Sequence, residues 1–238
     1  MTPTTATPGR PGQAPAGRPA TARGLRTREH ILDTAERLWG ERGVEGVSLR
    51  EIRIAAGQRN SSALQFHFGG RDGLLRALAE RHLPRLAAQQ ERLYARFVAE
   101  GRADDVVALV ELLVRPTAEY LRLGSSERAW VEVSASLAGK PDVALADVMA
   151  HVPAIALHAG ASVHEHLAAT LGSALAVERI VAVTSACNHL CADRARAEDT
   201  PPSPAAAVVR PALPFDDWVR NLVDMAVAAM LAPARGRP

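Results

Sequence analysis

A run of small polar side chains follows Gly57 and has the chemistry needed to read the edges of DNA bases. Arginine pairs with guanine edges and asparagine with adenine, whereas serine and glutamine bond to more than one base. A helix that enters the major groove needs a polar outer face that is small enough to approach those edges. The residues expected to supply that face are Arg59, Asn60, Ser61, Ser62 and Gln65.

Candidate phosphate contacts flank this run on both sides. The stretch 48–51 has the form of a capping box, in which Ser48 and Glu51 satisfy the first amides of a helix. A helix start binds phosphate through its free amides and its polar side chains, which here include Ser48 and Arg50. Arg71 opens the following helix and is expected to contact a further phosphate.

Helical periodicity predicts the elements that position these side chains. Apolar residues from Ile31 to Trp39 recur on one face of a helix, for which Thr27 is the expected N-cap. Two short helices joined by a tight polar turn, after a first one, form a helix-turn-helix. The predicted helices run over about 27–40, 48–57 and 61–67, and a long helix begins near residue 71.

Residues 27–82 resemble the DNA-binding domain of TetR/AcrR-type transcriptional regulators. The matching pieces are 31–35, Trp39, Gly43, 48–52, 56–57, 64–69 and 70–74. The resemblance implies phosphate contacts at Ser48, Arg50, Phe66, His67 and Arg71, and a base-facing side at Ser61, Ser62, Ala63 and Gln65.

Three positions depart from the family pattern. The turn over 58–62 is one residue longer than the commonest family turn, and Gln65 stands where the family usually has tyrosine. Arg53 stands where a small residue is common. These departures affect the base contacts more than the docking mode.

The resemblance also implies the architecture, which is an all-α fold. An N-terminal three-helix DNA-binding domain precedes a larger C-terminal helical domain that binds a small ligand and dimerises. The implied function is a homodimeric repressor that a small molecule releases from a palindromic operator in double-stranded DNA. The implied divisions are a disordered Pro/Ala/Arg tail at 1–24, the DNA-binding domain at 25–82 and the ligand-binding and dimerisation domain at 83–238, with a Pro-rich loop at 199–214.

Residues 83–238 are expected to be helical throughout, because no segment alternates with period two. Gly160 is expected to separate two of these helices. The last two helices carry more apolar side chains than one chain can bury around a ligand cavity, which predicts pairing with a second copy. The predicted helices run over about 104–122, 126–138, 142–157, 160–171, 174–196 and 215–231, and the predicted dimer interface contains Leu175, Ile180, Val183, Trp218, Leu222, Met225 and Ala229.

Charge is divided unevenly along the chain. Residues 1–82 hold 13 Arg and 8 Asp plus Glu, a balance of +5, while the remainder holds 15 Lys plus Arg and 18 Asp plus Glu, a balance of −3. The basic first part favours an anionic partner. The sequence has no run of about 18 apolar residues and no apolar stretch typical of a signal peptide, so we expect no membrane partner and a cytoplasmic location.

Other residue groups favour other chemistry. Trp130, His151 and His158 are candidates to line a ligand cavity, although solvated or capping histidines are an alternative. Cys187 and Cys191 share one helix face, and we expect them to be buried small hydrophobic residues.

We expect no catalytic residue, no metal site and no cofactor, because no nucleophile elbow, P-loop, dinucleotide-binding turn or HExxH motif occurs. Two alternatives stay open. One is an all-helical enzyme, and the other is a regulator controlled by a protein partner or by thiol oxidation at Cys187 and Cys191.

Overall fold

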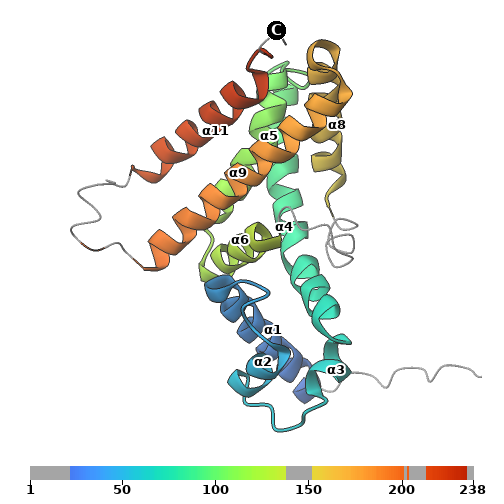
Figure 1. Cartoon of the computed structure of the whole chain (residues 1–238), viewed down its shortest axis with the longest axis vertical. Helices are drawn as coiled ribbons and strands as arrows, with labels where there is room; N and C mark the ends of the chain where they lie inside the picture. The colour runs from blue at the N-terminus through green and yellow to red at the C-terminus, as the bar shows by residue number, and fades with distance from the viewer. Residues whose placement is uncertain (1–21, 138–151, 201–202, 204–212, 235–238) are drawn as a thin grey trace, which may run out of the picture.

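The computed structural model describes residues 22–137, 152–200, 203 and 213–234, and the regular elements within these ranges are all α-helices (Figure 1). The all-α fold class is therefore confirmed. In chain order the helices are α1 (Ala22–Arg42), α2 (Leu49–Ala55), α3 (Ala63–Phe68), α4 (Arg71–Ala99), α5 (Val106–Tyr120), α6 (Ser125–Leu137), α8 (Ala154–Leu171), α9 (Ser173–Asp199) and α11 (Phe215–Leu231).

The first three helices form a small unit around Trp39, whose side chain is fully buried. The indole Nε1–H of Trp39 donates to the carbonyl of Val47 at 3.4 Å, which joins α1 to the start of α2. Ile52 of α2 and Leu64 of α3 are buried in the same apolar core. The apolar face predicted for the first helix therefore holds the helix-turn-helix together.

Local sequence signals set the ends of α2 and α3. The Ser48 hydroxyl accepts the amide N–H of Glu51, and the Glu51 carboxylate accepts the N–H of Ser48 at 2.8 Å, which confirms the predicted capping box. Gly57 has φ +63°, a left-handed conformation that glycine adopts without strain. The chain therefore turns directly after α2 and enters the segment that leads to α3.

Helix α4 connects this unit to the rest of the chain. It runs from beside α3 at the bottom of Figure 1 to the top of the molecule. Leu74 and Leu78, near its start, are buried, and so are Leu93 and Phe97, near its end. The predicted domain division after residue 82 falls inside α4, so one helix contributes to both cores.

The C-terminal helices form the larger unit. Helix α5 packs against α4, α8 and α11, while α9 packs against α6 and α8. Helix α6 also packs extensively against α1, so the two units meet along a second interface besides α4. None of the described helices is long and apolar enough to cross a membrane.

Several predicted boundaries are wrong. Helix α1 begins at Ala22, so Thr27 lies inside it and is not an N-cap. The early start is stabilised from outside the helix, because Glu29 pairs with Arg81 of α4 and Arg28 lies over the Phe68 ring. Residues 1–21, most of the predicted tail, lie outside the described residues.

Gly160 does not separate two helices, because α8 continues through it and buries Ala159 and Val163 on either side. Packing of this face outweighs the modest helix-breaking tendency of a single glycine. Most of the predicted helix 142–157 and of the predicted loop 199–214 lies outside the described residues, and α9 itself continues to Asp199.

Candidate functional site

The outer face of α3 and of the turn before it is polar and exposed. Arg59, Ser61 and Gln65 extend away from the core. Asn60 Oδ1 accepts the backbone N–H of Ser62 at 3.0 Å, so this side chain also shapes the turn. Most of the side chains predicted to face DNA bases therefore share one accessible surface.

Ala63 is an exception. It is only 7% exposed and belongs to the apolar core together with Leu64. Placing it on the base-facing side was wrong, because its side chain packs in the core. Its role is to pack α3 against the rest of the unit.

The end of α3 carries an exposed aromatic ring beside a half-buried histidine. Phe66 is 83% exposed, which is unusual for a side chain of this size. Burial, assisted by the Arg28 charge, lowers the pKa of His67 below its usual value. His67 therefore takes up a proton less readily than a free imidazole.

The predicted phosphate contacts differ in their surroundings. Arg50 is exposed on α2, and no hydrogen bond or ion pair of its side chain occurs within the described residues. The Ser48 hydroxyl donates to the Glu51 carboxylate at 2.8 Å. Hydrogen bonds from the Ser48 backbone and side chain, with Arg42 nearby, lower the pKa of Glu51 to about 2.

Arg71 is held by the protein itself. Its guanidinium donates to the carbonyls of Val44 and Val47 and lies 5.9 Å from the Trp39 ring centroid. A distant ion pair with Glu45, at 3.9 Å, adds to this. Arg71 therefore fixes the loop between α1 and α2, in addition to any contact with phosphate.

A buried polar network joins the two units, and the sequence analysis did not identify it. His82 of α4 is fully buried, and its Nε2 contacts a carboxylate oxygen of Glu36 on α1. Its Nδ1 lies 2.9 Å from the Tyr120 hydroxyl, and its ring stacks on Trp130 of α6 with centroids 5.2 Å apart. Burial raises the pKa of Tyr120 to about 12, so its hydroxyl stays protonated.

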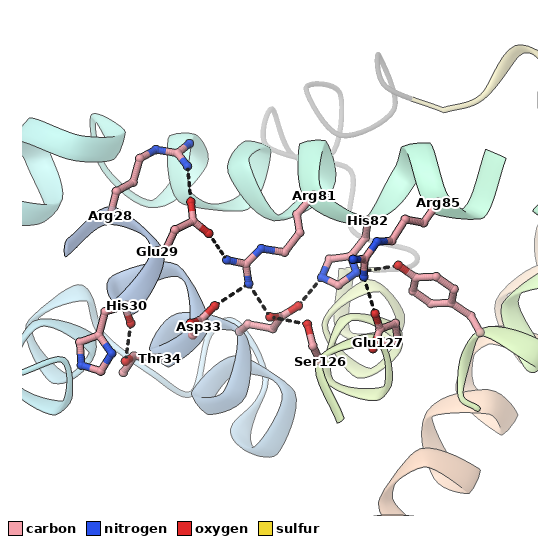
Figure 2. Close-up of polar contacts among 12 residues, drawn as sticks. Arg28, Glu29, His30, Asp33, Thr34, Arg81, His82, Arg85, Ser126 and Glu127 are labelled. Atoms are coloured by element: carbon pink, nitrogen blue, oxygen red, sulfur yellow. Dashed lines mark hydrogen bonds and ion pairs between the residues drawn. The ribbon is translucent and has the colours of Figure 1, made fainter. Parts of the chain in front are cut away.

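Arg81 extends this network toward the surface. Figure 2 shows its guanidinium, on α4, between Glu29 and Asp33 of α1, each at 2.7 Å. Glu36 also accepts from Arg81 and from the Ser126 hydroxyl of α6, both at 3.0 Å. The detectable signal in the sequence was an acidic stripe at helical spacing, Glu29, Asp33 and Glu36, beside the apolar face of the same helix.

The other face of the network borders a pocket of about 300 Å³ between α4, α5, α6, α8 and α9. Trp130 forms part of its wall. His158 instead packs edge-on against Tyr94 at 5.8 Å and does not line this pocket. His151 lies outside the described residues, although the adjoining Val152 and Pro153 line the pocket.

The pocket also has polar side chains in its lining, which are Gln90, Thr117, Ser134, Thr184 and Asn188. Its described lining holds no charged side chain, and Ser134 and Thr184 donate their hydroxyls to carbonyls of their own helices. Gln90 is only 8% exposed, and its Oε1 meets no donor within the described part of the chain. The pocket is thus lined mostly by apolar side chains, and the oxygen of one amide in its lining lacks a donor.

Cys187 and Cys191 are buried on one face of α9. Burial raises the pKa of Cys187 to about 11 and raises that of Cys191 further, so neither thiol ionises readily. Reaction with oxidants requires the thiolate. Within the described residues, no group of three or more metal-ligating side chains comes together.

The predicted dimer residues divide into exposed and buried members. Met225 is 51% exposed, Leu175 and Ala229 are also exposed, and Ile180, Val183 and Trp218 are half-buried. Leu222 is only 2% exposed because it faces the core of its own chain. Assigning Leu222 to an interface with a second copy was therefore wrong.

Comparisons with known proteins agree with the helix-turn-helix and with the all-helical fold. Residues 31–78 match the family model described as bacterial regulatory proteins, tetR family. A crystal structure of a HlyIIR mutant, with residues 170–185 substituted by alanine, has 14% identity and a TM-score of 0.50 over 84% of this chain and 94% of that chain. At this identity the likeness concerns the fold.

A structure of Salmonella enterica GusR has 21% identity and a TM-score of 0.41 over 87% of this chain and 96% of that chain. A search of curated proteins found no significant match.

Proposed function

This chain is a DNA-binding transcriptional regulator of the TetR family, and from that premise we propose that it is a dimeric repressor released from a palindromic operator by a small molecule. The observation that carries the proposal is the stack of Trp130 on His82, which in turn contacts Glu36. Three side chains connect the wall of a C-terminal pocket to a helix of the DNA-binding unit.

The ligand should be a neutral, mostly apolar molecule with at least one hydrogen-bond donor. Because the described lining of the pocket has no charged side chain, it disfavours binding of an ion, whose buried charge would have no partner. A donor that reaches the amide of Gln90 would satisfy an oxygen that otherwise has none. The volume of about 300 Å³ is at the lower end of the range for ligand pockets.

Ligand binding acts on DNA through the position of Trp130. A ligand that shifts this ring also shifts His82, whose contacts with Glu36 and Tyr120 define how α1 sits against α4. Only one separation of the two recognition helices in a dimer fits successive half-sites, roughly 34–36 Å apart. The ligand must bind one arrangement more tightly than the other to change operator affinity.

The second copy pairs with the exposed apolar side chains of α9 and α11. Val177 and Val181 are exposed, as are Leu175 and Met225, and pairing with a second copy would remove these apolar side chains from water. Small residues on the same helices, Ala182, Ala186 and Ala229, are exposed and permit close approach. Such interfaces bury on the order of 2,000 Å² or more.

The experiment combines operator binding with direct ligand binding. Operator binding by the parent protein is measured by fluorescence anisotropy, with a duplex from its own promoter region, in the presence and absence of neutral compounds. Binding of the same compounds is measured separately, as quenching of Trp130 fluorescence in a Trp39→Phe, Trp218→Phe variant. A compound that quenches Trp130 should also lower operator affinity by at least about tenfold. In His82→Gln the compound should still bind while operator release is lost.

The outcome that contradicts the proposal is a quenching ligand that leaves operator affinity unchanged in the parent protein. Release by oxidant alone, abolished in a double variant Cys187→Ser, Cys191→Ser, would instead favour control by thiols. The buried positions and raised pKa values of both thiols argue against that alternative.

A further inference from the structure

A second hollow lies between α1, α6 and the end of α9, and it is distinct from the pocket behind Trp130. Its volume is about 980 Å³. Asp33 and Glu41 line it from α1, Glu132 from α6, and Arg196 and Asp199 from α9. Because α1 belongs to the DNA-binding unit and α6 and α9 to the other unit, this cleft lies across the interface of the two.

The carboxylates at the rim of the cleft each have an arginine partner. Asp33 pairs with Arg81 at 2.7 Å and Glu41 with Arg37 at 3.0 Å. Asp199 accepts from Arg128 at 2.8 Å. These groups are satisfied without any ligand, so they do not by themselves indicate a site.

Glu132 is different. It is only 9% exposed, lines the cleft, and has no hydrogen-bond donor or ion-pair partner in the part of the chain that the structure describes. The nearby Arg196 bonds to Asp193 instead. Burial raises the pKa of Glu132 to about 7. A carboxylate that is shielded from most of the solvent and has no protein partner is costly to ionise, and its open side faces the cleft.

Helices α1 and α6 approach each other closely at Gly40. A β-carbon at Gly40 would lie 3.0 Å from Oε2 of Glu132 and 3.1 Å from the α-carbon of Ala129. The absence of a side chain at Gly40 therefore lets α6, with the Glu132 carboxylate, approach the backbone of α1. Glu132 is therefore held at the seam between the two units, beside the open volume of the cleft.

We propose that this cleft is a second effector site, which takes a small organic cation with an amine or guanidinium group that donates to Glu132. Glu132 is the acidic residue of the described lining without an arginine partner, because Asp33 and Glu36 pair with Arg81, Glu41 pairs with Arg37, and Asp199 pairs with Arg128. The C-terminal end of α9 adds the negative end of its helix dipole. A cation bound there contacts both units and so favours one arrangement of α1 against α6.

The site is separate from the Trp130 pocket, although Glu36, which lines the cleft, also contacts His82 behind that pocket. That pocket has no charged residue in its described lining and shares no residue with the cleft. Cation binding in the cleft can therefore be tested without knowing whether a neutral ligand binds in the Trp130 pocket. Failure of one proposal does not imply failure of the other.

The test uses the full chain, with n-butylammonium and n-butylguanidinium as probes and n-butylurea as the uncharged control. Calorimetry and thermal shift at pH 8 should show one saturable site per chain for each cation and none for the urea. Glu132→Gln should weaken cation binding at least about tenfold, since an isosteric amide removes the charge. Glu41→Gln, at an exposed and already paired carboxylate, should change it less than about threefold.

The pH dependence gives a second readout. Cation affinity should fall as pH drops from 8 to 6, because Glu132 takes up a proton in this range. The charged groups that face Glu132 are Glu41 of α1, Arg128 of α6 and Arg196 and Asp199 of α9, and none of them is a histidine.

No saturable binding of either cation, or equal binding by the Glu132→Gln protein, would overturn the proposal. Equal binding of butylurea would also overturn it, since it would indicate apolar binding without use of the carboxylate. The thermal midpoint of Glu132→Gln without ligand shows whether this protein is folded, and the intact Glu41→Gln protein serves as the matched reference.

Discussion

At the scale of single residues, Arg50 and Arg71 both stand at helix starts, but only Arg71 is bonded to the protein itself. Arg71 donates to two carbonyls of the loop before α2, whereas the guanidinium of Arg50 is exposed and has no partner within the described residues. An arginine that is free in the absence of DNA contributes mainly through counterion release. An arginine that also holds a loop contributes to folding as well.

Arg50→Ala and Arg71→Ala should therefore behave differently. Both should weaken binding to all DNA sequences, and Arg50→Ala should reduce the slope of log affinity against log salt by about 1. Only Arg71→Ala should also lower the free energy of unfolding, by roughly 1–3 kcal/mol, because two carbonyls lose a charged donor. Anisotropy titrations at several salt concentrations and thermal denaturation separate the two effects, and an Arg71→Ala protein of unchanged stability would contradict this assignment.

Glu132 predicts a pH dependence of stability. Burial raises its pKa from 4.5 to about 7, so the folded state binds its proton more tightly than the unfolded state. The stabilising contribution is fully present below pH 4.5 and is lost as pH rises through 7. Glu132→Gln should therefore stabilise the protein relative to the parent at pH 8, by roughly 1–3 kcal/mol, and not at pH 4.5.

Urea unfolding of the two proteins across this range measures the difference. Glu41→Gln is the control, because Glu41 is exposed and paired with Arg37. A difference between parent and Glu132→Gln that did not vary with pH would show that the carboxylate is not the titrating group.

At the scale of elements, α3 has two faces with separate tasks. Ala63 and Leu64 pack inward, while Gln65 and Phe66 extend outward. A six-residue helix is too short to be stable alone, so its position depends on this inward packing. Changes on the two faces should consequently have different effects.

Phe66→Ala and Gln65→Ala should leave thermal stability nearly unchanged and weaken DNA binding. Gln65→Ala should relax the preference at one position of each half-site, by about 1–3 kcal/mol for a direct bidentate contact. Phe66→Ala should reduce affinity for all sequences, since this residue aligns with a phosphate contact. Selection from randomised duplexes reports both effects, and Ala63→Ser serves as the inward-facing comparison, which should affect stability first.

At the scale of the whole molecule, α9 and α11 lie alongside each other (Figure 1). Both helices leave apolar side chains exposed. The chain has a continuous core without them, because Leu222, Val219 and Met230 already bury the inner face of α11. The exposed apolar side chains of α9 and α11 therefore do not contribute to the core of the monomer. A two-fold interface would bury these side chains on both copies of the chain.

Met225→Asp and Val181→Asp should produce monomers that bind the operator far more weakly, because a single half-site supplies about half of the contacts. Sedimentation velocity at micromolar concentration measures the oligomeric state. Val98→Asp is the matched control, since Val98 is an equally exposed apolar residue on α4. Variants that sediment as the parent dimer would place the interface elsewhere.

The sequence by itself determined what depends on neighbours a few residues away. The capping box at Ser48 and Glu51, the turn at Gly57 and the apolar periodicity around Trp39 involve contacts within a turn or two, so residue types at fixed spacing were enough to predict them. The match of residues 31–78 to a known family depends on the same local pattern.

Only the tertiary structure decided what depends on distant segments. His82 and Glu36 are 46 positions apart, and no spacing rule brings them together. Leu222 and Met225 belong to one helix and both are apolar, yet only packing against α5 and α9 determines which is buried. Helix starts such as Ala22 also depend on distant partners, since an ion pair with α4 can extend a helix beyond its own signals. Local hydrogen bonds and apolar periodicity depend on residues close in sequence, whereas burial and long-range pairing depend on how distant segments pack in the folded chain.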